Sequence, residues 1–265
     1  MSDLPASGTI ERWAWDYVRA SSLEHKLAPP PIPEAWEREP RARRIDAPGR
    51  PPELVRAARR SKTPGAEALR DPRKRAELLH VFFHHELQAA ELMLRAMLLF
   101  ADREPAFRRG LLRIARDEIR HMGLYADHLR ALGSHVGAFP VRDWFWERVP
   151  SASDPIAFLG LLGIGFEGAN LDHTRRFASA FRAAGDEAGA RLQDIVGAEE
   201  VPHVRFAAHW IEAWTGAPPI FDAWLATIPR PLSPIVMRGR PIDRERRREA
   251  GLSNAFVDRL EDWEP

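Results

Sequence analysis

The segment RDEIRHMGLYADHLRALG, residues 116–133, decides the fold of this chain. It carries Glu118 and His121 three residues apart, so that a carboxylate and an imidazole lie on one face of a predicted helix and can converge on one metal ion. The segment VGAEEVPHVRF, residues 196–206, repeats the pair as Glu200 and His203. Helical bundles that bind two metals take one Glu from each of two helices and a Glu-x-x-His from each of the other two. The two segments therefore predict such a bundle.

Four long helices are predicted around these motifs, over residues 72–100, 106–132, 154–184 and 187–214. The first and third breaks between these helices are short, and the second is long. Asp154 and Pro155 suit an N-cap and a first helical turn, and glycines follow the predicted helix ends. Two helical hairpins joined by one long crossover are typical of the ferritin-like variant of the four-helix bundle. We therefore expect an all-α protein with a ferritin-like four-helix bundle.

The distances from the two hairpin turns select the remaining ligands, because residues equally far from a turn lie at the same height in an antiparallel hairpin. Glu86 precedes Glu118 by 32 residues, and Glu167 precedes Glu200 by 33. The two separations differ by one residue, which corresponds to about 1.5 Å of helix rise. Four buried carboxylates need compensating charge, which two divalent ions would supply. The predicted metal ligands are Glu86, Glu118, His121, Glu167, Glu200 and His203.

Other candidates on the first helix are less favoured. Glu91 lies closer to the turn than Glu86 by five residues, or roughly 7 Å, and is expected to form a surface ion pair with Arg95. Glu77 and His80 form a third Glu-x-x-His with no counterpart in the second hairpin, and are expected at the surface or at a cap. The structural alternative to a metal site is a buried polar network closed by arginines and waters.

The bulk composition suits one structural domain with extensions. The chain has 265 residues, a formal net charge of +1 and no cysteine, so any metal must be held by His and carboxylates. Residues 1–71 are expected to hold a helix near Ile10–Ala20 and a proline-rich arm, which packs on the bundle of residues 72–216. Residues 217–265 form a helical extension, with candidates at 221–227, 243–250 and 253–262. The arm is favoured as a structural wrap over a lid on an active site.

A cytoplasmic location is expected, because the N-terminal residues resemble no signal peptide and the longest apolar run, Ile156–Phe166, is too short to span a bilayer. The near-zero net charge makes nucleic acid an unfavoured partner. The basic run RGRPIDRERRRE has acids interleaved with its arginines, which favours a solvated helix. Tyr125, one turn beyond His121, is favoured as a core tyrosine, with a supporting role beside the metals as the alternative.

Several segments resemble a ferritin-like family catalogued as domain-of-unknown-function family 455. They are LLHVFFHHELQAAELM, RDEIRHMGLYADHLRALG, VGAEEVPHVRF and the tail PLSPIVMRGRPIDRERRREAGLSNAF. The resemblance covers most of the chain from about residue 50 onward, and it implies the same six metal ligands. Two positions depart from the family pattern. His85 stands where an aliphatic residue is expected, and Pro202 lies inside the last Glu-x-x-His, where it predicts a kink or bulge.

The leading functional hypothesis is a di-metal oxidoreductase that uses O2 as an oxygenase or oxidase. Two divalent ions are expected as cofactors, with iron favoured, manganese next and zinc last. Glu118 and Glu200 are expected to bridge them. The expected partners are O2, a small-molecule substrate and, for an oxygenase, an electron donor, and a small homo-oligomer is compatible with the sequence. A non-catalytic metal store and a tRNA-modifying hydroxylase on the same fold are the alternatives.

Overall fold

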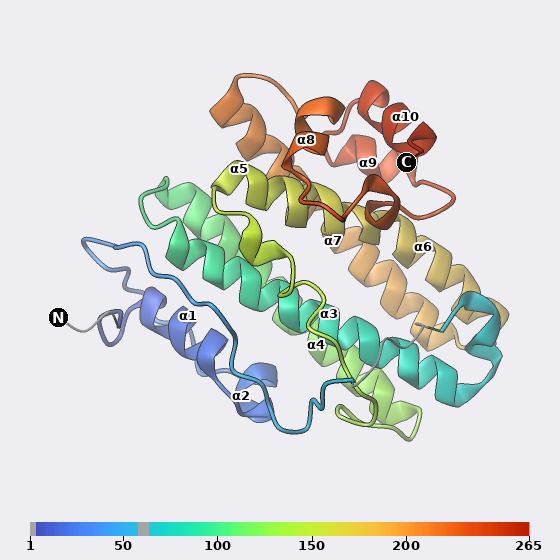
Figure 1. Cartoon of the computed structure of the whole chain (residues 1–265). Helices are drawn as coiled ribbons and strands as arrows, with labels where there is room; N and C mark the ends of the chain where they lie inside the picture. The colour runs from blue at the N-terminus through green and yellow to red at the C-terminus, as the bar shows by residue number, and fades with distance from the viewer. Residues whose placement is uncertain (1–3, 58–63, 265) are drawn as a thin grey trace. The chain divides into compact units, whose positions relative to one another are not determined.

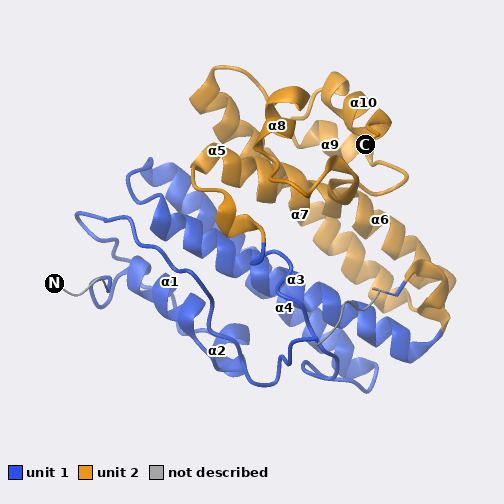
Figure 2. Cartoon of the chain, in the orientation of Figure 1, with its two compact units in different colours: residues 1–64, 71–147 blue, residues 65–70, 148–265 orange. Residues whose placement is uncertain are grey.

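The computed structural model describes residues 4–57 and 64–264. The chain divides into two compact units (Figure 2). Unit 1 comprises residues 1–64 and 71–147, and unit 2 comprises residues 65–70 and 148–265. Across the described ranges the regular structure is helical, and β-pairing is limited to two isolated bridges, Thr9 with Ala35 and Arg56 with Val141. The protein is all-α.

Unit 1 is built on one long helical hairpin (Figure 1). Its helices are α1 Ile10–Arg19, α2 Leu23–Leu27, α3 Pro72–Leu99 and α4 Pro105–Ala131. α3 begins as its sequence predicts, because the Asp71 side chain accepts a hydrogen bond from the Arg73 backbone N–H and Pro72 occupies the first turn. α3 packs against α4, and α1 packs against α3. Both hairpin helices lie within one residue of their predicted bounds.

Residues 28–57 form an extended segment, here called the strap, that is bonded to α1 and α3. The backbone N–H of Arg43 donates to the Leu98 carbonyl at 2.9 Å, and the Arg95 side chain donates to the Ile45 carbonyl at 2.9 Å. At Gly49 an added Cβ would lie 2.2 Å from the Arg19 carbonyl oxygen, so only glycine permits this approach. The dense prolines keep the segment extended, and these bonds hold it along the helices.

Unit 2 contains the second hairpin and the C-terminal helices. The elements are η1 Ala66–Arg70, η2 Val149–Ser151, α5 Pro155–Phe158, the π-helix Leu159–Glu167, α6 Gly168–Ala183, α7 Glu187–Thr215, α8 Phe221–Thr227, η4 Pro234–Met237, α9 Arg244–Glu249 and α10 Asn254–Asp262. α6 packs against α7 across a tight turn in which Gly185 has a φ of 77°. The three tail helices occur where the sequence predicts them.

The third long helix differs from its prediction as one continuous α-helix over 154–184. One α-helical turn, α5, leads into a π-helix that ends at Glu167, and α6 follows. Glycines allow neighbouring side chains to reach the π-helix backbone. A Cβ at Gly163 would lie 2.5 Å from the Cβ of Ala207, and one at Gly160 would lie 2.5 Å from Oγ1 of Thr227. The wider turn is therefore shaped by packing partners far along the chain.

In the portion of the chain that the structure describes, no helix has both the length and the apolar character needed to cross a bilayer.

Candidate metal centre

Unit 1 brings three predicted ligands together in what we call the unit 1 half-site. Glu86 comes from α3, and Glu118 and His121 come from successive turns of α4. One ligand atom from each lies within 4.8 Å of those of the other two. Nδ1 of His121 lies 3.2 Å from a Glu118 oxygen and 3.6 Å from a Glu86 oxygen. All three side chains are buried.

The electrostatics of this half-site favour a cation or a proton. Burial raises the pKa of Glu86 well above its ordinary value, and the hydrogen bond and charge of Glu118 raise it further, while His121 acts in the opposite direction. Two carboxylates this close in a poorly solvated place cannot both stay ionised without compensation. A bound cation would supply that compensation in place of the proton.

Unit 2 brings its predicted residues together in a second cluster, the unit 2 half-site. Glu167 closes the π-helix, and Glu200 and His203 lie one turn apart on α7. Nδ1 of His203 is 3.0 Å from Oε2 of Glu200. The side-chain nitrogen of Asn170, on α6, lies 3.3 Å from Oε2 of Glu167 and 3.3 Å from Oε1 of Glu200. The two glutamates and His203 are buried.

Asn170 is a member of this cluster that the sequence prediction missed. A signal for it exists, because Asn170 follows Glu167 by three residues and therefore shares its helix face. The sequence prediction considered carboxylates and imidazoles as metal ligands and therefore did not include an amide side chain.

Both half-sites offer ligand types that a divalent ion accepts, and the unit 1 residues also have the spacing for one ion. Each half-site offers two carboxylates and one imidazole, which are common protein ligands of iron, manganese and zinc. Ligand atoms about 2 Å from one ion lie within about 4 Å of each other. The spread of at most 4.8 Å in the unit 1 half-site is close to that requirement.

Glu91 is not the surface residue that the sequence predicts. Its side chain is fully buried, and its carboxylate lies 2.8 Å from Nζ of Lys26 and 2.6 Å from Nη1 of Arg50. The indole of Trp146 donates to the other oxygen at 2.7 Å. Burial by itself would raise the pKa of Glu91, but the two cations outweigh burial and hold the pKa below its ordinary value. Both oxygens are thus engaged in a buried ion network, and the predicted pair with Arg95 is wrong.

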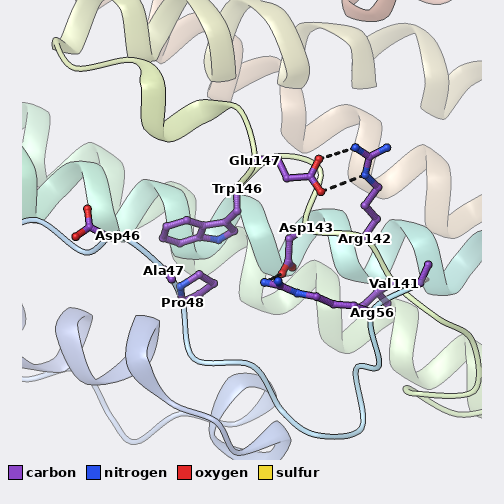
Figure 3. A pocket seen from close by; sticks show the side chains of 10 residues that line it. Asp46, Ala47, Pro48, Arg56, Val141, Arg142, Asp143, Trp146 and Glu147 are labelled. Atoms are coloured by element: carbon purple, nitrogen blue, oxygen red, sulfur yellow. Dashed lines mark hydrogen bonds and ion pairs between the residues drawn. The ribbon is translucent and has the colours of Figure 1, made fainter. Parts of the chain in front are cut away.

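The same network continues to a cavity of about 350 Å³ between the strap and the segment 141–147 (Figure 3). Asp143 lies at its wall and accepts hydrogen bonds from Arg50 at 2.7 Å and Arg56 at 2.6 Å. Figure 3 shows Trp146 beside Pro48 and the guanidinium of Arg56 beside Asp143. Arg50 therefore links the strap to both Asp143 and α3, which supports the expectation of a structural wrap.

The third Glu-x-x-His splits between two environments. Glu77 forms a partly exposed ion pair with Lys74 at 2.7 Å, as expected of a surface residue. His80 is buried and accepts a hydrogen bond from the Gly137 backbone N–H at 2.8 Å. His84, one turn further, is also buried and lies 3.0 Å from Asp143. The expected place at the surface or at a cap is wrong for His80, because segment 135–147 covers it as well as His84.

The two positions that depart from the family pattern are accommodated within helices α3 and α7. His85 stacks on Phe145, with ring centroids 4.9 Å apart, so an aromatic contact replaces the expected aliphatic one. Pro202 lies inside α7, which continues through it to Thr215. His203 remains beside Glu200 despite the missing backbone N–H. Tyr125 is buried with its ring 5.7 Å from that of Phe82, as expected of a core tyrosine.

The basic tail is only partly a solvated helix. Arg247 of α9 is fully buried and forms a paired hydrogen bond with Asp172 at 3.2 and 2.7 Å. The backbone N–H groups of Gly239 and Asp243 donate to the same carboxylate. The prediction is therefore wrong for Arg247, which fixes the tail of unit 2 to α6.

These features define an all-helical protein with a buried group of Glu and His side chains that could hold a metal ion. The chain belongs to the family described as protein of unknown function (DUF455), whose model matches residues 7–258. The match begins earlier than the expected residue 50 and takes in α1 and the strap.

An uncharacterized protein of Haemophilus influenzae is 30% identical over 146 residues, which cover 52% of this chain and 51% of the relative. The chain therefore spans about half the length of the curated relative that it matches. No solved structure matches this chain.

Proposed function

We propose that this protein is a ferritin-like di-metal carboxylate protein that uses O2 to oxidise a small-molecule substrate. One observation carries the proposal: each unit presents a buried Glu from one helix and a Glu-x-x-His from the next. The same ligand types recur at nearly the same distance from each hairpin turn. A duplicated ligand set of this kind is the pattern of bundles that hold two metal ions.

In this proposal each half-site holds one ion through its imidazole and its carboxylates. Glu86, Glu118 and His121 would hold one ion, and Glu167, Glu200 and His203 would hold the other. Burial of the carboxylates excludes bulk water and strengthens their attraction for cations. Iron is the favoured metal and manganese the second, since both accept mixed carboxylate and imidazole ligation. Bound iron would supply the electrons and open coordination positions for reduction of O2.

Metal analysis of protein purified without oxygen tests the binding part of the proposal. We expect two divalent ions per chain in the wild type and about one in Glu86→Ala and in Glu167→Ala. Glu77→Ala is the matched control, because Glu77 belongs to the third Glu-x-x-His and pairs with Lys74 at the surface. A wild type that saturates at one ion, or an equal loss in the control, would overturn the assignment.

Oxygen consumption separates an enzyme from a store. The reduced, iron-loaded wild type should consume O2 in amounts comparable to its bound iron and then stop until electrons are supplied again. A store should instead accumulate many iron atoms per chain and assemble into a large closed shell. Sedimentation and iron titration therefore distinguish the two, and continued iron uptake beyond two ions would refute the enzymatic proposal.

A further inference from the structure

We infer that Asn170 is a positioning residue that orients Glu167 and Glu200, the two carboxylates of the unit 2 half-site. The inference rests on the proposed function. It starts from one contact: the side-chain nitrogen of Asn170 lies 3.3 Å from an oxygen of Glu167 and 3.3 Å from an oxygen of Glu200. The amide therefore joins the two carboxylates of this half-site.

The chemistry of an amide matches this place. A primary amide nitrogen carries two N–H donors and the two carboxylates offer acceptors, so one donor is available for each. The reverse orientation would place the amide oxygen against two carboxylates, and these negatively charged oxygens would repel one another. Because Asn has no ionisable group, it donates to both glutamates at any pH without competing as an anionic ligand.

The two oxygens of Glu200 face different partners. Oε1 faces the amide of Asn170, and Oε2 lies 3.0 Å from Nδ1 of His203. Asn170 thus engages the oxygen on the side away from the imidazole. Oε2 of Glu200 is thus the oxygen that would hold an ion together with His203. Such outer hydrogen bonds fix the orientation of metal ligands.

Close packing of α6 against α7 allows the short Asn side chain to reach Glu200. A Cβ at Gly197, one turn before Glu200, would lie 2.3 Å from Oγ1 of Thr174. Thr174 also donates from Oγ1 to the Asn170 carbonyl at 2.7 Å, which fixes the helix at that residue. The absence of a side chain at Gly197 therefore brings the two helices near enough for the amide to span them.

The corresponding sequence position in unit 1 holds a residue without this donor. The residue three positions after Glu86 is Ala89, whereas the residue three positions after Glu167 is Asn170. A methyl group donates no hydrogen bond, so Ala89 cannot make the contact that Asn170 makes in unit 2. The two half-sites share their ligand types and differ at this sequence position. In unit 2 the amide therefore holds one oxygen of each carboxylate before an ion arrives.

The test is anaerobic titration of the full chain with Mn²⁺ against a competing chromogenic chelator. Asn170→Ala removes the amide, and Asn170→Leu keeps a side chain of similar size without the donors. Each should lower the affinity for one of the two ions by about 10- to 100-fold, the usual effect of losing an outer hydrogen bond to a metal ligand. The other ion should stay within about twofold of wild type. Asn254→Ala, at an exposed asparagine of α10, is the matched control.

Combination with ligand variants assigns the weakened ion to a unit. In Glu86→Ala the remaining ion belongs to unit 2, so adding Asn170→Ala should weaken it. In Glu167→Ala the remaining ion belongs to unit 1, and the same addition should leave it unchanged. Equal Mn²⁺ affinities in wild type and Asn170→Ala would overturn the inference while two-ion binding stands. An equal loss at both ions with lower melting of the metal-free protein would show a structural role only. A wild type without bound Mn²⁺ would overturn the proposed function itself.

Discussion

Replacement of Glu91 by Gln should destabilise the protein and leave its metal loading intact. Gln keeps the size of the side chain and an oxygen that can accept from Trp146, so the change isolates the negative charge. Lys26 is fully buried beside this carboxylate, with its Nζ also bonded to the Tyr17 and Val18 carbonyls at 2.6 and 3.1 Å. Without the Glu91 charge the ammonium keeps these neutral carbonyls and the Tyr17 ring, whose centroid lies 4.9 Å from Nζ.

The magnitude follows from the partners that remain. Removing one member of a buried ion pair costs about 3–5 kcal/mol, because the other charge is left uncompensated. Arg50 retains Asp143 at 2.7 Å, so we expect the lower end of that range. A loss of about 3 kcal/mol lowers the melting temperature of a domain of this size by roughly 6–12 °C.

Calorimetry and metal analysis of the same samples check this prediction. Glu77→Gln on the same helix is the control, because its ion pair with Lys74 is partly exposed and such pairs contribute below about 1 kcal/mol. Addition of Lys26→Met to Glu91→Gln should restore part of the lost stability, since no uncompensated ammonium remains. Normal melting of Glu91→Gln together with a lost ion would refute the reasoning and exchange the roles of Glu86 and Glu91.

The contribution of Glu91 to stability should change with pH in a defined direction. The pKa of Glu91 is lowered in the folded state, so its contribution is present above the ordinary Glu value of about 4.3 and is lost as pH falls through the folded-state pKa. The difference in melting temperature between wild type and Glu91→Gln should therefore be full at neutral pH and shrink in acid below about pH 4. A difference that grows in acid would contradict the assignment of Glu91 as an ionised partner.

Two further predictions concern the metal-free protein and the π-helix. The pKa of Glu86 is raised, so folding takes up a proton there, and the metal-free wild type should gain stability as the pH falls from 8 toward 5. Melting scans should show a flatter dependence of melting temperature on pH for Glu86→Gln than for wild type. Equal slopes for the two proteins would contradict this prediction. Gly163→Ala should cost about 1–3 kcal/mol by overpacking, because the new Cβ would lie 2.5 Å from that of Ala207. Gly123→Ala, which meets nothing within 4 Å, should be neutral or stabilising in the same denaturant titration, and equal destabilisation of the two would refute the packing argument.

Local sequence determined the helices and the composition of each half-site. The apolar period, Pro72, Asp154, Gly185 and Gly216 gave helix bounds close to those observed, because helix formation and capping depend on neighbouring residues. The three-residue spacing of Glu and His fixes which side chains share a helix face, whatever surrounds the helix. Equal distances from the hairpin turn also selected Glu86, which the structure brings to Glu118 and His121 within unit 1.

Tertiary structure alone decided which charged side chains are buried and where the third helix widens. Glu91 looks like a surface residue from its helix, and it is buried because Lys26, Arg50 and Trp146 reach it from three other segments. The π-helix depends likewise on close approach by Ala207 and Thr227. Such pairings join residues dozens of positions apart, and local periodicity holds no information about them. Their energy depends on the low dielectric and close packing that exist only after the chain has folded.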